Sequence, residues 1–566
     1  MERKRIGVIV DSLLAPHWVY YVIDNLIMGD FAEVVLVIET GHHPLPQSNN
    51  AKGESCSKLL KEALSKYFRL DALFNPVCPN AFDRKSLLNV IEEIPQLQMD
   101  PREITLDVDK YTVLCEQIAD YRLDVILAFG WWRPANMSQF LARDGIWYYQ
   151  HGSPGCFSKA SACFDEIANG FVESSAQLKI IRQDIANEYI LCDCYGQTDT
   201  LSVFRNNNIN HWKTAAYLIR QVKKLYQQGS ERFFMDLEQI PQNMARGPEA
   251  NVNRNQNKLY LLWQMVLTAV NKKIRHALYF EQYFLQLKLG SLAPLSIDPA
   301  EFSHLVPPVD RFWADPFVVM EQGKFYVFIE EVLGKGNNGH ISCMEISGDG
   351  SLVSVKPVIN EPYHMSYPYV FQHGQRYYMI PETAANGTIS LYQCDDFPYR
   401  WTKVQVLMKN IHAYDTTLLY RDGLWWIFAT VCEHIGTPSN DELHIFYGKE
   451  LFSDQWTPHP QNPVVCDVRS ARPAGKIFEQ DGSFYRPSQN CKPRYGYGLK
   501  INRIEQLSTS QYREQCIAKI EPGWDDEIVA VHTINQTEGM IVMDGVLKRM
   551  RPLQDYFRYF RKLTRQ

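Results

Sequence analysis

A pattern of about fifty residues recurs five times in the second half of the chain, and it restricts the architecture more than any other feature of the sequence. Each copy has a polar or proline-containing start, a strand-like run, a glycine turn and a second aromatic or apolar run. The turn glycines lie 51, 49, 59 and 57 residues apart: Gly323, Gly374, Gly423, Gly482 and Gly539. Strand hairpins repeated at such a period are typical of propeller blades. The repeat therefore predicts an all-β five-bladed propeller over residues 300–547.

The residues that start the repeats are candidates for a common site, because the innermost strands of a propeller line a central funnel. Asp315 starts the first repeat, Tyr367 the second, Asp415 the third and Arg472 the fourth. An acid at the start of a strand is commonly a turn residue. Two acids at equivalent positions in different blades favour a different interpretation, a shared site.

Further acids lie at the ends of neighbouring second strands, namely Glu330, Glu331 and Glu382. Carboxyl groups that face each other suit either hydrogen bonds to sugar hydroxyls or acid–base chemistry on a glycosidic bond. We therefore predict that Asp315, Asp415 and Glu382 are catalytic. The predicted substrate-binding residues are Arg472, Tyr367, Glu330 and Trp313.

The segments "WADPF" (313–317) and "YDTTLLYRDG" (414–423) resemble the five-bladed propeller glycosidases of the arabinanase and β-xylosidase clan. The resemblance implies that Asp315 is the general base and that Asp415 tunes the pKa of the acid. In "SARPAG" (470–475), Arg472 stands where the clan has its proton-donating Glu. A guanidinium does not donate a proton at neutral pH, but it binds phosphate through paired hydrogen bonds. Arg472 is thus expected to bind a phosphate, which leaves Glu382 or Glu330 as the acid.

"SARPAG" and "WADPF" are also similar to the propeller that precedes the transferase domain of plant glucosamine inositolphosphorylceramide transferases. This resemblance covers about residues 300–545 and implies glycan transfer. It favours a substrate that is a sugar, a nucleotide-sugar or a lipid-linked glycan.

The first 229 residues alternate strands and helices. Apolar runs at 5–11 and 33–39 flank a helical pattern at 16–27, and a longer helix is expected over 210–229. Strands buried on both faces and separated by helices predict an α/β domain with a parallel sheet.

"YYQHGSPG" (148–155), "FDEIANG" (164–170) and "TDTLSVFRNNNINHWK" (198–213) resemble the formyltransferase fold in its polysaccharide-associated branch. The resemblance implies that His151 is catalytic and that 10-formyltetrahydrofolate is the cofactor. Tyr149 and Ala186 replace the Asn and Asp of that family, with Asp184 two positions early, so we predict no classical formyl transfer.

The remaining segments are predicted as a linker and helix (230–299) and a basic amphipathic C-terminal helix (548–566) that offers a peripheral membrane contact. Thirteen scattered cysteines without ligand spacing predict no metal site, and a net charge of −6 argues against nucleic-acid binding. The basic start runs straight into a strand-like segment, so a cytoplasmic location is expected.

These observations favour a transferase of surface-glycan biosynthesis that acts on a nucleotide-linked or lipid-linked sugar. A glycoside hydrolase of arabinan or xylan type is the first alternative. A non-catalytic glycan-binding scaffold with two degenerate sites is the second.

Overall fold

The structure is a computed structural model, and it describes residues 2–41, 54–100, 108–129, 142–152, 163–182, 189–238, 258–290, 297–334, 338–434 and 436–551. The chain divides into two compact units. The first holds residues 1–194, 198–267 and 435–437, and the second holds residues 195–197, 268–434 and 438–566. An α/β sheet in the first unit and a five-bladed propeller in the second confirm the predicted fold class. Among the described helices, none is long and apolar enough to span a membrane.

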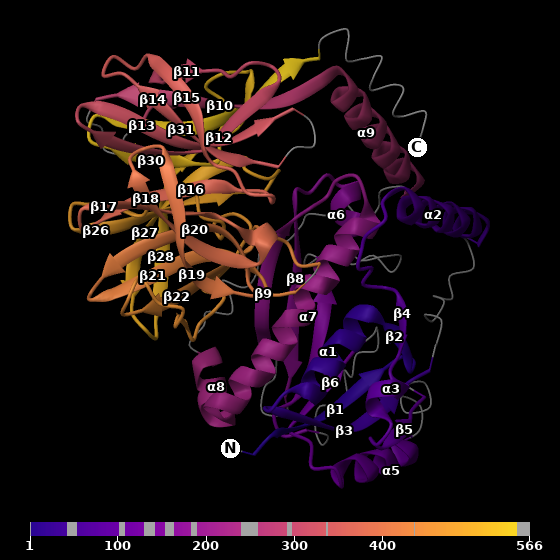
Figure 1. Cartoon of the computed structure of the whole chain (residues 1–566). Coiled ribbons are helices and arrows are strands. Elements are labelled where there is room, and N and C mark those ends of the chain that lie inside the picture. Colours follow the sequence, from indigo (N-terminus) through magenta and orange to yellow (C-terminus); the bar gives the residue numbers. More distant parts are fainter. Residues whose placement is uncertain are drawn as a thin grey trace. The chain divides into compact units, whose positions relative to one another are not determined.

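A seven-stranded sheet forms the centre of the α/β fold in the described residues, in the order β5-β3-β1-β6-β7-β8-β9. The first five strands in this order, β5, β3, β1, β6 and β7, pair in parallel, and β8 is antiparallel to β7. Ile, Val and Leu side chains fill both faces of the central strands, as expected for a sheet covered by helices (Figure 1). The strands are β1 (Lys4–Val10), β3 (Ala32–Glu39), β5 (Gln96–Gln98), β6 (Val125–Ala128), β7 (Ile146–His151), β8 (Glu173–Ile181) and β9 (Tyr189–Gln197), with a separate small pair of β2 (Leu14–Pro16) and β4 (Arg84–Ser86).

The long helix α7 begins seven residues before its predicted start. Ser202 caps it by accepting a hydrogen bond from the Arg205 amide at 3.0 Å. Asn206 binds both backbone groups of Asp199, so the asparagine-rich stretch lies inside the helix and is not a loop. The helices are α1 (His17–Met28), α2 (Glu54–Phe74), α3 (Leu88–Ile91), α5 (Val108–Ala119), α6 (Phe164–Ala168), α7 (Val203–Gln228), α8 (Ser230–Glu238) and α9 (Lys258–Leu278).

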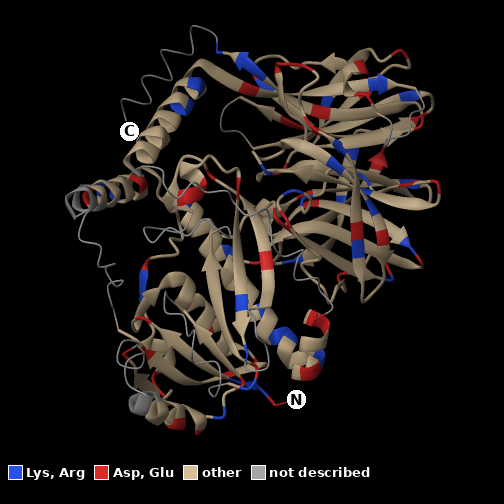
Figure 2. Ribbon diagram, turned by 180° about the vertical axis from the view of Figure 1, so that it is seen from behind, with Lys and Arg blue, Asp and Glu red and all other residues tan. Residues whose placement is uncertain are grey.

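Four blades of the propeller are consecutive antiparallel sheets, and Figure 2 shows charges of both signs interspersed along the propeller strands. Blade one is β12 (Arg311–Glu321), β13 (Lys324–Leu333), β14 (His340–Ile346) and β15 (Leu352–Ile359). Blade two is β16 (Ser366–His373), β17 (Arg376–Glu382), β18 (Thr388–Asp396) and β19 (Arg400–Lys409). Blade three is β20 (His412–Arg421), β21 (Leu424–Cys432), β22 (Glu442–Gly448), β23 (Thr457–Pro458) and β24 (Val465–Cys466). Blade four is β25 (Phe478–Gln480), β26 (Ser483–Asn490), β27 (Gly498–Leu507) and β28 (Tyr512–Ile520).

The fifth blade joins strands from before and after the other four. Its inner strands are β30 (Ile534–Thr537) and β31 (Met540–Met550), and β29 (Ile528–Ala530) also pairs with β31. Its outer strands are β10 (Tyr279–Leu289) and β11 (Ser303–Leu305), which precede blade one in the chain. β10 pairs with β31 along its whole length (Figure 1).

This closure corrects two sequence expectations. Residues 279–289, predicted within a linker and helix, form a strand, because their alternating apolar side chains pack into the fifth blade. Residues 548–550, predicted as the start of a helix, end β31. The rest of the predicted C-terminal helix, 552–566, lies outside the described residues, and the domain boundaries stay predictions.

The turn glycines confirm the hairpin assignment. All five have positive φ, between 61° and 83°, as tight turns between paired strands require.

Candidate functional site

Three of the predicted site residues occupy the same strained position in three blades. Asp315, Tyr367 and Asp415 have φ angles of 52°, 44° and 52°. In each blade the pairing of the first two strands shifts register at this residue, so each lies in a β-bulge. Non-glycine residues with positive φ cost free energy and cluster at functional sites. The repetition of the bulge identifies the start of the inner strands as the candidate site.

The carboxylate of Asp315 is buried and bonded to neighbouring blades. It accepts a hydrogen bond from the Thr533 hydroxyl at 2.6 Å and one from the Tyr367 amide at 3.3 Å. Its own amide donates to Asp544 at 3.0 Å, which holds the bulge in place. Burial raises the pKa of Asp315 to about 6, although the charge of His532 opposes the rise. Asp315 therefore titrates close to neutral pH.

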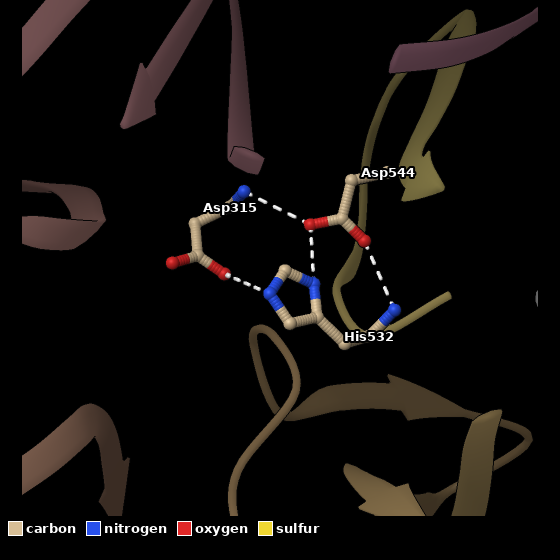
Figure 3. Close-up of side chains that lie close together, drawn as sticks. All are labelled: Asp315, His532 and Asp544. Atoms are coloured by element: carbon tan, nitrogen blue, oxygen red, sulfur yellow. Dashed lines mark hydrogen bonds and ion pairs between the residues drawn. The ribbon is translucent and has the colours of Figure 1, made fainter. Parts of the chain in front are cut away.

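His532 lies between Asp315 and Asp544 (Figure 3). Its Nδ1 is 2.5 Å from Asp544, and its Nε2 is 3.8 Å from Asp315. Burial lowers the pKa of His532, but the two carboxylates outweigh it and raise the pKa to about 9. The ring is thus an imidazolium at neutral pH. Ligand atoms of these three residues lie within 4.8 Å of one another, a spacing that suits a cation.

Asp415 and Arg472 form a buried bidentate ion pair. Nε and Nη2 of Arg472 donate to Asp415 at 2.6 and 3.0 Å, and Nη2 also reaches Glu382 at 3.4 Å. Nη1 donates to the carbonyl of Ser439 at 2.8 Å and to its hydroxyl at 3.4 Å. A guanidinium has five N–H donors, and five acceptors within the protein engage them. In this arrangement Arg472 orients two carboxyl groups, which differs from the predicted phosphate contact.

Two glutamates add carboxyl groups with raised pKa values to the cluster. Burial raises the pKa of Glu382 well above its usual range, and the charge of Asp415 raises it further. Burial also raises the pKa of Glu330, together with the charge of Asp315. A raised pKa favours the protonated form, in which a carboxyl group can donate a proton. The cluster therefore combines candidate acids with a candidate base.

Two other residues predicted to bind substrate, Tyr367 and Trp313, make hydrogen bonds within the protein. The phenol of Tyr367 contacts the Thr417 hydroxyl at 2.9 Å and accepts from the Gly475 amide at 2.6 Å, linking three blades. Trp313 is buried in an apolar cluster, and its indole donates to Glu331 at 3.1 Å. The structure thus places Trp313 in the core, where its ring is not available to stack on a sugar.

His151 lies apart from this cluster, in the α/β sheet. Its ring stacks on His211 with centroids 3.7 Å apart, and Nε2 lies 3.0 Å from the Thr214 hydroxyl. Burial lowers the pKa of His151 well below its usual value, and His211 lowers it further, so the ring is neutral. His211, with Trp18, lines a cavity of about 220 Å³ at the carboxyl end of β1. Asp184, Ala186 and the 153–155 part of the motif lie outside the described residues.

The sequence interpretation missed three residues that complete the cluster, His532, Thr533 and Asp544. His532 and Thr533 lie seven and six residues before the turn glycine Gly539, close to the position that Asp315 has eight residues before Gly323. Asp544 lies in the second strand of its hairpin, as Glu330 and Glu382 do in theirs. Extending the alignment to the fifth copy, at the repeat start for His532 and Thr533 and in the second strand for Asp544, would have identified all three.

Comparisons with known proteins match the propeller part of the chain. Residues 298–523 match the family model for the N-terminal region of glucosamine inositolphosphorylceramide transferase 1. The protein of that name from Oryza sativa subsp. japonica is 34% identical over 207 residues, which are 36% of this chain and 28% of the rice protein. The corresponding Arabidopsis thaliana protein is 32% identical over 207 residues, with 36% and 27% covered. The chain thus matches less than a third of the length of these relatives.

Solved structures match the chain with low overall scores. An exo-1,5-α-L-arabinanase from a bovine ruminal metagenomic library is 14% identical with a TM-score of 0.30, covering 42% of this chain and 92% of that one.

Proposed function

We propose that the chain is a carbohydrate-active transferase of glycan biosynthesis, and that its propeller binds a nucleotide-linked or lipid-linked sugar at the buried acid cluster. The observation that carries the proposal is the bulge repeated at Asp315, Tyr367 and Asp415. A positive φ at a non-glycine residue costs free energy, and the chain adopts it at the same polar position in three blades. The relatives' name, which joins glucosamine to an inositolphosphorylceramide, supports a sugar donor and a lipid-linked acceptor.

In the proposed reaction, Asp315 is the base. With a pKa of about 6 it is ionised at neutral pH, and it accepts the proton of an acceptor hydroxyl as the new bond forms. Glu382 or Glu330, whose pKa values are raised by burial, donates a proton to the leaving oxygen. Arg472 is a positioning residue, because its bonds fix the carboxyl groups of Asp415 and Glu382.

Product analysis tests this function. The purified chain is incubated with nucleotide-sugars and with inositol-containing lipids, and the products are identified by mass spectrometry. We expect a glycosylated lipid. We expect its formation to fall at least about a hundredfold in Asp315→Asn, within the range that loss of a general base produces. Asp310→Asn removes an exposed carboxylate five residues earlier and serves as the matched control.

A second candidate is a non-catalytic glycan-binding propeller. The saturated hydrogen bonding of Arg472 favours it, because the residue that replaces the glycosidase acid is fully engaged within the protein. Binding of oligosaccharide that Asp315→Asn weakens, with neither transfer nor release of free sugar, would support this candidate and contradict the transferase. Release of free sugar from arabinan or xylan would instead establish a hydrolase.

A further inference from the structure

Helix α9 has two apolar faces on opposite sides. Leu261, Leu262 and Met265 are buried in a cluster within the first unit. The second set, which we call the outer face, is 37% to 60% exposed and consists of Leu259, Tyr260, Trp263, Val266, Leu267, Val270, Ile274 and Leu278. The helix therefore has an exposed apolar face in addition to the apolar face that it buries.

The outer face is a continuous stripe. At 3.6 residues per turn its members fall within an arc of about 120° and extend along about 30 Å of helix. Scattered exposed apolar residues are normal on a protein surface, but a contiguous stripe of this size marks a binding surface.

The charge of α9 indicates what kind of surface it meets. Residues 258–278 contain no Asp or Glu, and their cations are Lys258, Lys272, Lys273, Arg275 and, when protonated, His276. Figure 2 shows the Lys and Arg bands on this helix. Trp263 and Tyr260 supply the amphipathic rings that favour the boundary between lipid headgroups and acyl chains. An apolar stripe with aromatic rings, on a helix that carries cations and no acids, is typical of a helix that lies on an anionic bilayer.

Two other partners for the outer face, a second copy of α9 and the segment 552–566, fit the positive charge of α9 less well. A second copy of α9 brings the same cations. The segment 552–566 of this chain adds Arg558, Arg561, Lys562 and Arg565 against one Asp555. Either partner sets like charges side by side, which costs free energy, whereas anionic headgroups neutralise the cations of both segments.

We propose that the outer face of α9 is a membrane-docking surface that inserts its apolar side chains into the headgroup region of an anionic bilayer. The last turn of α9 is tied to the propeller. The Arg551 amide donates to the carbonyl of Leu278 at 2.9 Å, and Arg551 Nε donates to that of His276 at 3.1 Å. Docking through α9 therefore anchors the propeller at a lipid surface. The inference stands on α9 alone and does not depend on the proposed transfer reaction.

Vesicle co-sedimentation of the full chain tests the proposal. The probes are vesicles of phosphatidylglycerol and phosphatidylcholine in equal parts, with pure phosphatidylcholine as the neutral comparison. We expect binding to the anionic vesicles that weakens with added salt, and little binding to the neutral ones. The double variant Trp263→Asn/Val270→Asn removes apolar area from the outer face, and we expect at least about tenfold weaker binding.

The matched control is Gln264→Asn/Thr268→Asn, which changes the same turns of α9 away from the outer face and should bind as the unchanged chain does. Thermal unfolding by circular dichroism shows that both variants keep their fold, and transfer to a soluble acceptor reports the propeller site separately. The proposal is overturned if the full chain ignores anionic vesicles or if both double variants bind equally well. It is also overturned if the outer-face variant only converts a dimer into a monomer in light scattering.

Discussion

Replacing Arg472 by methionine should destabilise the chain by about 3–5 kcal/mol, the range found when one partner of a buried ion pair is removed. Only 6% of the Arg472 side chain and 2% of the Asp415 side chain are exposed, so water cannot solvate the carboxylate that remains. Asp415 would keep the Gln489 amide, at 2.9 Å, as a donor. One hydrogen bond to a charged acceptor, which contributes about 1.5–3 kcal/mol, offsets only a part of the loss.

Removing both charges should restore most of that stability. In Arg472→Met/Asp415→Leu the guanidinium and its bidentate carboxylate partner are removed together, so neither member of the pair is left uncompensated. Buried ion pairs replaced by apolar side chains of similar volume are often neutral in their effect. We therefore expect a coupling free energy of about 3 kcal/mol in the double-mutant cycle.

Urea unfolding followed by circular dichroism measures these differences as changes in midpoint multiplied by the slope. Arg503→Met is the matched control, because Arg503 pairs with Glu505 at 3.3 Å while its side chain is 43% exposed. A surface pair of this kind should contribute less than about 1 kcal/mol. A cost below 1 kcal/mol for Arg472→Met, or additive effects in the cycle, would refute the electrostatic reasoning.

Three further predictions follow from single residues. His532 has a folded pKa of about 9 against an ordinary value of 6.5, so its contribution of about 3 kcal/mol is complete below pH 6.5 and is lost as pH rises through 9. The His532→Gln variant should therefore show no corresponding fall in its urea midpoint between these pH values, and a parallel fall in both proteins would contradict this. Gly475→Ala should lower the unfolding free energy by more than 3 kcal/mol, because its Cβ would lie 2.0 Å from the Ile534 carbonyl. Gly482→Ala, also at positive φ but in open space, should cost only about 1–2 kcal/mol. Incubation with 10-formyltetrahydrofolate and amino sugars should yield no formylated product by mass spectrometry, because Tyr149 occupies the position of the family's amide; a product heavier by one formyl group would disprove this.

The repeat revealed the propeller because its signal is local. A tight hairpin turn needs positive φ, glycine supplies it, and five such turns at one period identify five blades. The same reasoning brought Asp315, Asp415, Glu382 and Arg472 into one cluster, since each was counted from a turn glycine.

Contacts between segments that are distant in the sequence could not be predicted from a local pattern. Nothing local in 279–289 shows that β31 will pair with it, and an alternating run in a polar neighbourhood reads equally well as part of a linker. The closed hydrogen bonding of Arg472 also depends on Ser439, a residue with no pattern of its own. The engagement of a guanidinium can be judged only when all of its acceptors are located in space.

The pairing of β10 with β31 has a consequence for how the chain is made. A ribosome delivers β10 before the other four blades, but its eleven partners, from Met540 to Met550, follow all four of them. Until then β10 exposes an unpaired strand edge, and the loop that must close contains all four other blades. We therefore expect ring closure to be a late and slow step in folding. Nascent or prematurely terminated chains that stop before β31 should aggregate through this edge or depend on a chaperone.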